Sequence, residues 1–429
     1  MTLSKKNFAI IYMAFLFLSI YTPKYGTLDR MSTQYFLLSI TNFLAIVSVP
    51  LVFNLKHINF TRLYKNPLLI SYSFVLLISA LSFIKSINIT ESFVELNQQV
   101  SFFLTLVILT FLIMQNLINK KIILWIVFMS LIIDLSFSLY PIYTLIENEI
   151  SLKYSLISNF VGLAGNRNIL AISILFRIPL IIYFALEVKN KGIKTLSFIL
   201  LIFSFLSIFI LSSRASLLGI IILSLFFFFL FIFKVNSVDK NQVKRIGVLF
   251  FLPLLISYII STNVIENTDK ADVSSRIASI SSTTDESINS RLRYWSHATD
   301  FIYKNPFLGG GIGNWRIYSI KYDSAYIKSY IVPYSAHNDL LEFTAETGII
   351  GGLIFLSFFV ILFLLIIKTS GIFSEKFDFK IGFILISSFL IYFLDLNLNF
   401  PTSRPLNLFL LLMLISLTTI LLNKMNDKI

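Results

Sequence analysis

Residues 196–233 read LSFILLIFSFLSIFILSSRASLLGIIILSLFFFFLFIF, an apolar run that is typical of membrane-spanning helices. As one α-helix, its 38 residues would extend about 57 Å, nearly twice the roughly 30 Å hydrocarbon core of a bilayer. The run must therefore fold back on itself. Its one polar interruption is Ser212-Ser213-Arg214, so the sequence predicts two spans, 195–213 and 215–233, with Arg214 between them.

The composition of the whole chain also indicates a membrane solvent. Of its 429 residues, 56 % are apolar and 13 % are charged, whereas soluble domains have about 45–50 % and about 25 %. These fractions exclude a cytosolic enzyme, a secreted domain and a disordered protein. A basic cytoplasmic face explains the net charge of +13 better than a nucleic-acid partner does. The chain has no cysteine, which excludes disulfides, thiol nucleophiles and Cys-bound metals.

Ten further apolar stretches bring the expected number of spans to about twelve, because each supplies most of the roughly 20 residues that a crossing helix needs. The expected spans lie near residues 8–22, 34–55, 67–85, 99–118, 121–146, 166–187, 195–213, 215–233, 246–264, 348–367, 381–399 and 405–423. The expected fold class is therefore all-α integral membrane. The chain divides by side of the membrane into nine spans over 1–264, one large loop over 265–347, and three spans over 348–429.

The distribution of basic residues predicts the orientation of these spans. With the N-terminus inside, the cytoplasmic segments hold 19 Lys and Arg, whereas the short outer loops hold 7. The positive-inside rule therefore places both termini in the cytoplasm. Segment 265–347 is then an 83-residue outer loop that carries two of the three histidines. Within it, Leu292, Trp295, Ala298 and Ile302 recur at helical spacing, and Asn305-Pro306 ends the predicted helix.

The cytoplasmic side offers little room for chemistry. Its loops are too short for a nucleotide-binding domain, so ATP or nucleotide-sugar chemistry is not expected there. The glycine cluster at 309–313 fits neither G-x-G-x-x-G nor the P-loop pattern, and it follows a helix rather than a strand. We interpret it as a flexible turn or a close-packing element. The chain has no Asp-x-Asp pair that would support a metal–diphosphate site, and no metal or cofactor is expected.

Three residues expected on the outer side suit phosphate and proton chemistry. Arg214 lies between two apolar helices, where a charge is costly and should have a partner or a ligand. Arg291 opens the loop helix, and the planar fork of arginine matches phosphate oxygens, so the two arginines could hold a diphosphate. His337 precedes a helix whose positive end favours neutral imidazole, the form that a general base requires. A structural alternative stays open for each residue. Arg214 could be an interfacial arginine, Arg291 a solvated arginine or one in a cation–π contact, and His337 a merely hydrogen-bonded histidine.

Two charges are expected inside the membrane at matching depths. Asp134 lies about 13 residues into an outward-going span, and Arg177 lies 11 residues into the returning one. We therefore expect a buried ion pair with a structural role rather than a proton pathway.

The order of motifs resembles the bacterial O-antigen ligase and polymerase family. The resemblance covers about 166–352 and consists of NRNILA (166–171), SSRA (212–215), RLRYW (291–295), NPFLGGGIGNW (305–315), HNDLLE (337–342) and ETGIIG (346–351). No single piece is specific, but their order around one large outer loop is.

The resemblance implies a GT-C-like glycosyltransferase of the bacterial inner membrane, active at the periplasmic face in lipopolysaccharide biosynthesis. Its donor is a glycan on undecaprenyl diphosphate, and in ligases its acceptor is lipid A–core, without metal or ATP. The family's essential arginines fall on Arg214 and Arg291, and its essential histidine falls on His337. Arg167 and Asn168 are secondary candidates for donor contacts. The expected mechanism is one inverting displacement, in which the arginines hold the diphosphate and His337 activates or orients the acceptor hydroxyl.

Two other functions remain open from the sequence. A polysaccharide polymerase would use the same donor to extend another lipid-linked glycan, and the sequence does not distinguish the two acceptors. A transporter or flippase for the lipid-linked sugar would favour polar residues through the membrane midplane and repeated halves. One expected buried pair, no internal repeat and polar features gathered on one face favour the enzyme.

Overall fold

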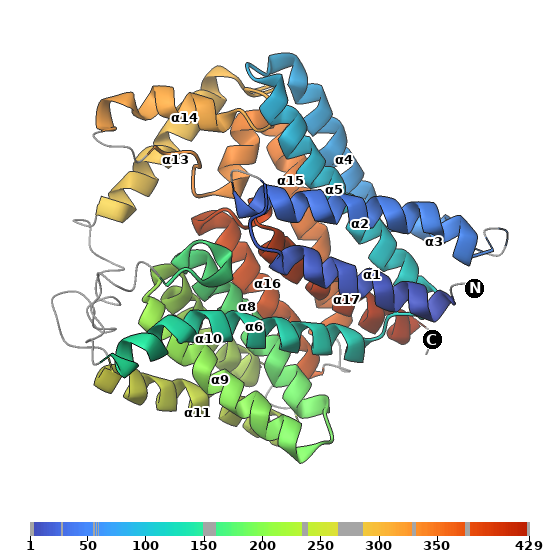
Figure 1. The fold of residues 1–429 in the computed structure, drawn as a ribbon, viewed down its shortest axis with the longest axis vertical. Helices are drawn as coiled ribbons and strands as arrows, with labels where there is room; N and C mark the ends of the chain where they lie inside the picture. Colours follow the sequence, from blue (N-terminus) through green and yellow to red (C-terminus); the bar gives the residue numbers. More distant parts are fainter. Residues whose placement is uncertain are drawn as a thin grey trace. The chain divides into compact units, whose positions relative to one another are not determined.

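The computed structural model describes residues 4–26, 29–54, 56, 58, 60–148, 160–233, 239–264, 286–327, 332–373 and 378–426. Across these ranges, helices are the only regular secondary structure (Figure 1). Eleven helices in the described ranges are long and apolar enough to cross a membrane. The protein is therefore an all-α, multi-pass membrane protein. Residues 265–285 of the predicted outer loop lie outside the described residues.

Every predicted span coincides with a helix. These are α1 (Lys5–Tyr21), α2 (Arg30–Val52), α4 (Pro67–Ser82), α5 (Ile89–Met114), α6 (Lys120–Glu147), α8 (Arg167–Glu187), α9 (Lys191–Leu211), α10 (Arg214–Phe233), α11 (Lys240–Val264), α15 (Asp339–Ser370), α16 (Phe379–Leu398) and α17 (Pro405–Asn426). The helix α1 has 17 residues and is shorter than the roughly 20 that a crossing needs. The remaining helices are α3 (Phe60–Tyr64), α13 (Glu286–Lys304) and α14 (Trp315–Asp323), with 3-10 turns η2 (Phe83–Lys85), η3 (Gly162–Ala164), η5 (Ser324–Tyr326) and η6 (Pro401–Ser403).

The predicted break in the long apolar run is present. The helix α9 ends at Leu211 and α10 begins at Arg214. Between them Ser212 adopts a left-handed backbone with φ 48°, and its N–H donates to the carbonyl of Ile208 at 3.1 Å. Its hydroxyl donates to the carbonyl of Phe209 at 2.8 Å. The left-handed residue ends α9 and satisfies its terminal carbonyls, as helix C-caps commonly do.

One helix begins well before its predicted position. The helix α5 starts at Ile89 rather than near residue 99. Asn88 is its N-cap, since its Oδ1 accepts hydrogen bonds from the backbone N–H groups of Thr90 and Glu91 at 3.1 and 3.3 Å. Polar residues in the first turns of α5 interrupt the apolar pattern, so hydropathy alone missed this part of the helix.

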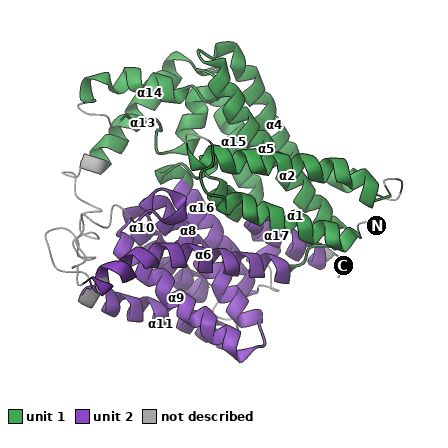
Figure 2. Ribbon diagram, in the orientation of Figure 1, with its two compact units in different colours: residues 1–119, 284–364, 396–412 green, residues 120–283, 365–395, 413–429 purple. Residues whose placement is uncertain are grey.

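The chain forms two compact units, each built from segments distant in sequence (Figure 2). Unit 1 comprises residues 1–119, 284–364 and 396–412, and unit 2 comprises residues 120–283, 365–395 and 413–429. In unit 1, α2 packs against α1 and α5, and α4 also packs against α5. In unit 2, α9 packs against α8 and α11. The helix α8 is the core of unit 2, because every residue from Ile169 to Ala185 is buried. The predicted division at residues 264 and 347 concerns the side of the membrane on which the loop lies, and it stays a prediction.

The predicted ion pair inside unit 2 is confirmed. Arg177 Nη2 on α8 and Asp134 Oδ2 on α6 are 2.5 Å apart, and both side chains are fully buried. Arg177 Nη1 also donates to the carbonyl of Ser130 at 3.3 Å. A buried charge is tolerated when a partner and hydrogen bonds satisfy it, so this pair ties α6 to α8.

Candidate functional site

The loop helix α13, which carries Arg291, is joined to α14 by a carboxylate. Arg293 Nε and Nη2 donate to the two carboxylate oxygens of Asp323 at 2.6 and 3.3 Å. This hydrogen bonding raises the pKa of Arg293. His297 Nδ1 lies 3.7 Å from the same carboxylate. Arg293 therefore links the two helices at Asp323, which is almost fully buried.

A small apolar core lies beneath α13. Its buried residues are Ala298, Phe301, Trp315, Ala336 and Ala345. Of the apolar face predicted for this helix, Ala298 is buried and Ile302 packs against the core, whereas Leu292 is 53 % exposed. Because Ala336 and Ala345 bracket the histidine segment in sequence, this core fixes both ends of that segment against α13.

The glycine cluster is a close-packing element. Gly309 and Gly311 have φ of 62° and 91°, which residues with side chains rarely adopt. A Cβ at Gly309 would lie 2.4 Å from the carbonyl oxygen of Ala345, and one at Gly311 would lie 2.2 Å from Ser86 Oγ. The Gly311 N–H donates to the carbonyl of Glu346 at 2.9 Å. Of the two predicted roles, the structure therefore supports close packing, and the cluster packs the loop against α15 and against Ser86, which precedes α5.

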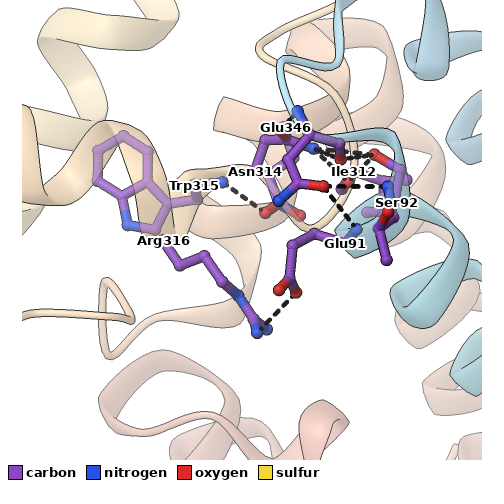
Figure 3. Close-up of polar contacts among 9 residues, drawn as sticks. Glu91, Ser92, Ile312, Asn314, Trp315, Arg316 and Glu346 are labelled. Carbon is purple, nitrogen blue, oxygen red and sulfur yellow. Dashed lines mark hydrogen bonds and ion pairs between the residues drawn. The ribbon is translucent and has the colours of Figure 1, made fainter.

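Polar contacts continue this attachment beyond the glycines (Figure 3). Asn314 Nδ2 donates to Ser92 Oγ at 2.8 Å, and its Oδ1 accepts from the backbone N–H of Asn88 at 2.7 Å. Figure 3 shows Arg316 reaching Glu91, where Nη1 and Oε2 are 3.0 Å apart. The start of α14 is thus held on the N-terminal turn of α5, all within unit 1.

A carboxylate also shapes the turn that carries His337. Glu342 Oε2 accepts hydrogen bonds from Ser335 Oγ and from the Ala336 N–H, both at 2.8 Å. The Ser335 hydroxyl oxygen in turn accepts from the His337 N–H at 3.1 Å. His337 has a left-handed backbone with φ 54°, which is uncommon outside glycine. Glu342 therefore holds the turn in place.

The half-buried imidazole of His337 lies among aromatic rings. Its ring centroid is 6.3 Å from Tyr294 and 5.1 Å from Phe400. Its Nδ1 is buried, and no described residue is its hydrogen-bond partner. Burial, and then the Arg291 cation, lower the pKa of His337 to about 4. This lowered pKa favours the predicted neutral imidazole, and its causes are burial and Arg291. His337 lies ahead of α15, which begins at Asp339, rather than in the first turn of the helix.

The connection between α16 and α17 packs against this turn, which the sequence did not indicate. Asp339 Oδ2 accepts hydrogen bonds from the N–H and Oγ1 of Thr402 at 2.9 and 2.7 Å. Arg291 Nη2 lies 3.5 Å from Asn399 Oδ1. The sequence offered one signal for this contact: the polar, proline-containing stretch NFPTSRP at 399–405, which lies between two apolar spans. Arg291 and His337 thus share one environment in unit 1.

The other predicted residues lie in unit 2. Arg214 and Arg167 are the first residues of α10 and α8. The two arginines are close enough to interact electrostatically. Asn168 N–H donates to Asn166 Oδ1 at 2.8 Å, which caps α8. Two cations at the positive ends of two helices favour an anion in this part of unit 2. The described residues contain no group of three or more His, Asp or Glu that could hold a metal ion.

The central part of the chain is similar to a known family. Residues 199–356 match a family model described as O-antigen ligase. No curated protein matches the chain. The matched range includes Arg214, Arg291 and His337, together with the glycine cluster that positions the loop. Residues 199–356 are therefore similar to the O-antigen ligase family.

Proposed function

We propose that this membrane protein transfers a glycan from undecaprenyl diphosphate to lipid A–core, at the periplasmic face of the bacterial inner membrane and with both termini in the cytoplasm. The observation that carries the proposal is the half-buried imidazole of His337. It has a buried Nδ1 without a described partner, it is close to Arg291, and it lies inside the matched domain. These features suit a group that receives a proton next to a bound anion.

The reaction is a single displacement at the anomeric carbon of the donor. The acceptor oxygen forms a bond to this carbon while the bond from the carbon to the diphosphate oxygen breaks, with inversion. The hydroxyl proton passes to the imidazole of His337, and undecaprenyl diphosphate leaves as an anion. The energy comes from the donor, because a diphosphate is a good leaving group.

Arg291 stabilises the charge that develops on the diphosphate as it leaves. Because the Arg291 cation contributes to the low pKa of His337, a diphosphate bound to Arg291 would offset that effect. Donor binding would then raise the pKa of His337 toward the range that suits a general base. We also assign Arg214 to the diphosphate, with Arg167 and Asn168 as further donor contacts, on the family resemblance and the local charge of unit 2.

In vitro transfer tests the proposal with purified full-length protein, undecaprenyl-diphosphate-linked glycan and lipid A–core. The native chain is compared with His337→Ala and with His297→Ala, which changes a histidine of α13 that lies 3.7 Å from Asp323. Glycan should appear on lipid A–core with the native chain and with His297→Ala, but not with folded His337→Ala.

Other outcomes of the same experiment would support one of the two alternative functions, a polymerase or a transporter. Longer undecaprenyl-linked chains without modified lipid A–core would establish a polymerase that uses the same donor. No transfer to either acceptor, together with movement of labelled donor across proteoliposome membranes, would overturn the enzyme and support a transporter.

A further inference from the structure

Arg404 lies between η6 and α17, next to the histidine turn of unit 1. Its side chain is half-buried, and its Nε is fully buried with no hydrogen-bond partner in the described part of the chain. Its guanidinium carbon lies 4.8 Å from the ring centroid of Phe400. The other arginines of unit 1 include Arg293 and Arg316, which donate to Asp323 and Glu91. Arg404 instead has an aromatic ring beside it.

The charge of Arg404 is incompletely compensated by its surroundings. Burial lowers its pKa, although Tyr35, Asp29 and Asp339 act in the opposite direction. One of these carboxylates, that of Asp339, accepts two hydrogen bonds from Thr402 through Oδ2. A guanidinium stays protonated in proteins, so burial without an acceptor is costly unless an anion arrives.

A second buried polar group lies within electrostatic range of Arg404. The hydroxyl of Tyr35 on α2 is buried and has no hydrogen-bond partner among the described residues. Tyr35 and Arg404 are close enough to interact electrostatically. Buried donors are nearly always paired in folded proteins. Two buried donors within electrostatic range of each other, both without an acceptor among the described residues, suit an acceptor supplied from outside the chain.

Contacts within unit 1 connect Arg404 to the proposed chemistry. The ring of Phe400 packs 5.1 Å from the ring of His337 and 4.8 Å from the Arg404 guanidinium carbon. One aromatic side chain thus contacts both groups. The hydrogen bonds from Thr402 to Asp339 fix the same segment to the start of α15. Arg404 is therefore held at a defined place beside His337.

We propose that Arg404 is a third phosphate-binding arginine, which holds the diphosphate of the donor beside His337. This inference rests on the proposed function and adds a residue to it. The guanidinium fork matches two phosphate oxygens, and contact with the ring of Phe400 restricts its orientation. As the diphosphate leaves, its growing negative charge gains a further fixed donor.

The test uses the full-length protein with Arg404→Gln, which removes the charge, and Arg404→Lys, which keeps the charge but loses the fork. The matched control is Lys24→Gln, an exposed basic residue of the predicted outer face. Thermal unfolding establishes that each variant is folded. Arg404→Gln should raise the donor KM about 10- to 100-fold and leave the acceptor KM unchanged, as expected when one charged hydrogen-bond donor is lost. Arg404→Lys should fall between, and Lys24→Gln should match the native chain.

A binding measurement separates this inference from the proposed function. Each variant in nanodiscs is tested for binding of two lipids: undecaprenyl diphosphate without glycan, and undecaprenol without phosphate. Arg404→Gln should weaken binding of the diphosphate only. If native protein binds the diphosphate through Arg404 but transfers no glycan, the proposed function fails and the inference stands. Unchanged donor KM and unchanged diphosphate binding in Arg404→Gln, or an equal loss for undecaprenol, would overturn the inference.

Discussion

Arg177 in unit 2 and Arg404 in unit 1 differ in what their guanidinium groups contact. Arg177 is fully buried, pairs with Asp134, and also donates to a backbone carbonyl. In both arginines the buried Nε has no hydrogen-bond partner among the described residues. The difference lies in the rest of the guanidinium: that of Arg177 is paired with a carboxylate inside the fold, whereas that of the half-buried Arg404 lies 4.8 Å from the ring centroid of Phe400. A charge paired with a carboxylate contributes to the fold, and we expect a charge that has an aromatic ring beside it to be available to a ligand.

The largest effect should come from the histidine beside Arg404. His337→Ala should lower kcat for glycan transfer at least about 100-fold, because a positioned proton acceptor contributes about 10²- to 10⁴-fold. Its melting temperature should stay close to that of the native chain, since Nδ1 of His337 makes no described hydrogen bond. Retained turnover in the folded variant would contradict a chemical role for His337.

Breaking the Asp134–Arg177 ion pair should lower the stability of the protein, in contrast to His337→Ala, which should lower kcat and leave the melting temperature unchanged. Asp134→Ala leaves Arg177 buried without its carboxylate and should destabilise the protein by about 3–5 kcal/mol. The double variant Asp134→Ala with Arg177→Ala should recover part of this loss, because no uncompensated charge remains. Chemical denaturation in detergent measures both. A double variant no more stable than either single variant would show that the pair does not couple.

Glu342 has a role between the chemical one of His337 and the structural one of the ion pair, because it positions the turn that carries His337. Glu342→Ala removes the acceptor of the Ser335 and Ala336 hydrogen bonds and should lower kcat about 10- to 100-fold through misplacement of the imidazole. Glu342→Gln, which keeps one acceptor oxygen, should recover part of the activity. Glu91→Ala, a carboxylate paired with Arg316, is the matched control. An equal loss in that control would indicate general loosening of the loop.

The smallest effect concerns pH. With the pKa of His337 at about 4, kcat/KM should stay level from pH 7 to about pH 5 and fall through pH 4, rather than near 6.5. Arg291→Gln removes the nearby cation and should move this fall to higher pH, whatever the residual rate. The stability that His337 contributes is present above about pH 6.5 and is lost toward pH 4, because the unfolded chain binds the proton first. A fall unchanged by Arg291→Gln would argue against coupling between the two residues.

The sequence alone was sufficient for the membrane architecture. Hydropathy is a local property summed over a window, and the bilayer sets the length of that window, so each predicted span coincides with a helix. Equal depth along two spans was also enough to pair Asp134 with Arg177. Where the local pattern was mixed, as in the polar first turns of α5, the prediction began too late.

Tertiary structure alone decided how the polar residues are used. Asn88 bonds to Asn314 across 226 positions, and Asp339 bonds to Thr402 across 63. No window over the sequence contains such partners, because the burial and pairing of a polar group depend on whichever distant segment packs against it. The neutral state of His337, the packing role of the glycines and the unpaired Nε of Arg404 all follow from those distant contacts.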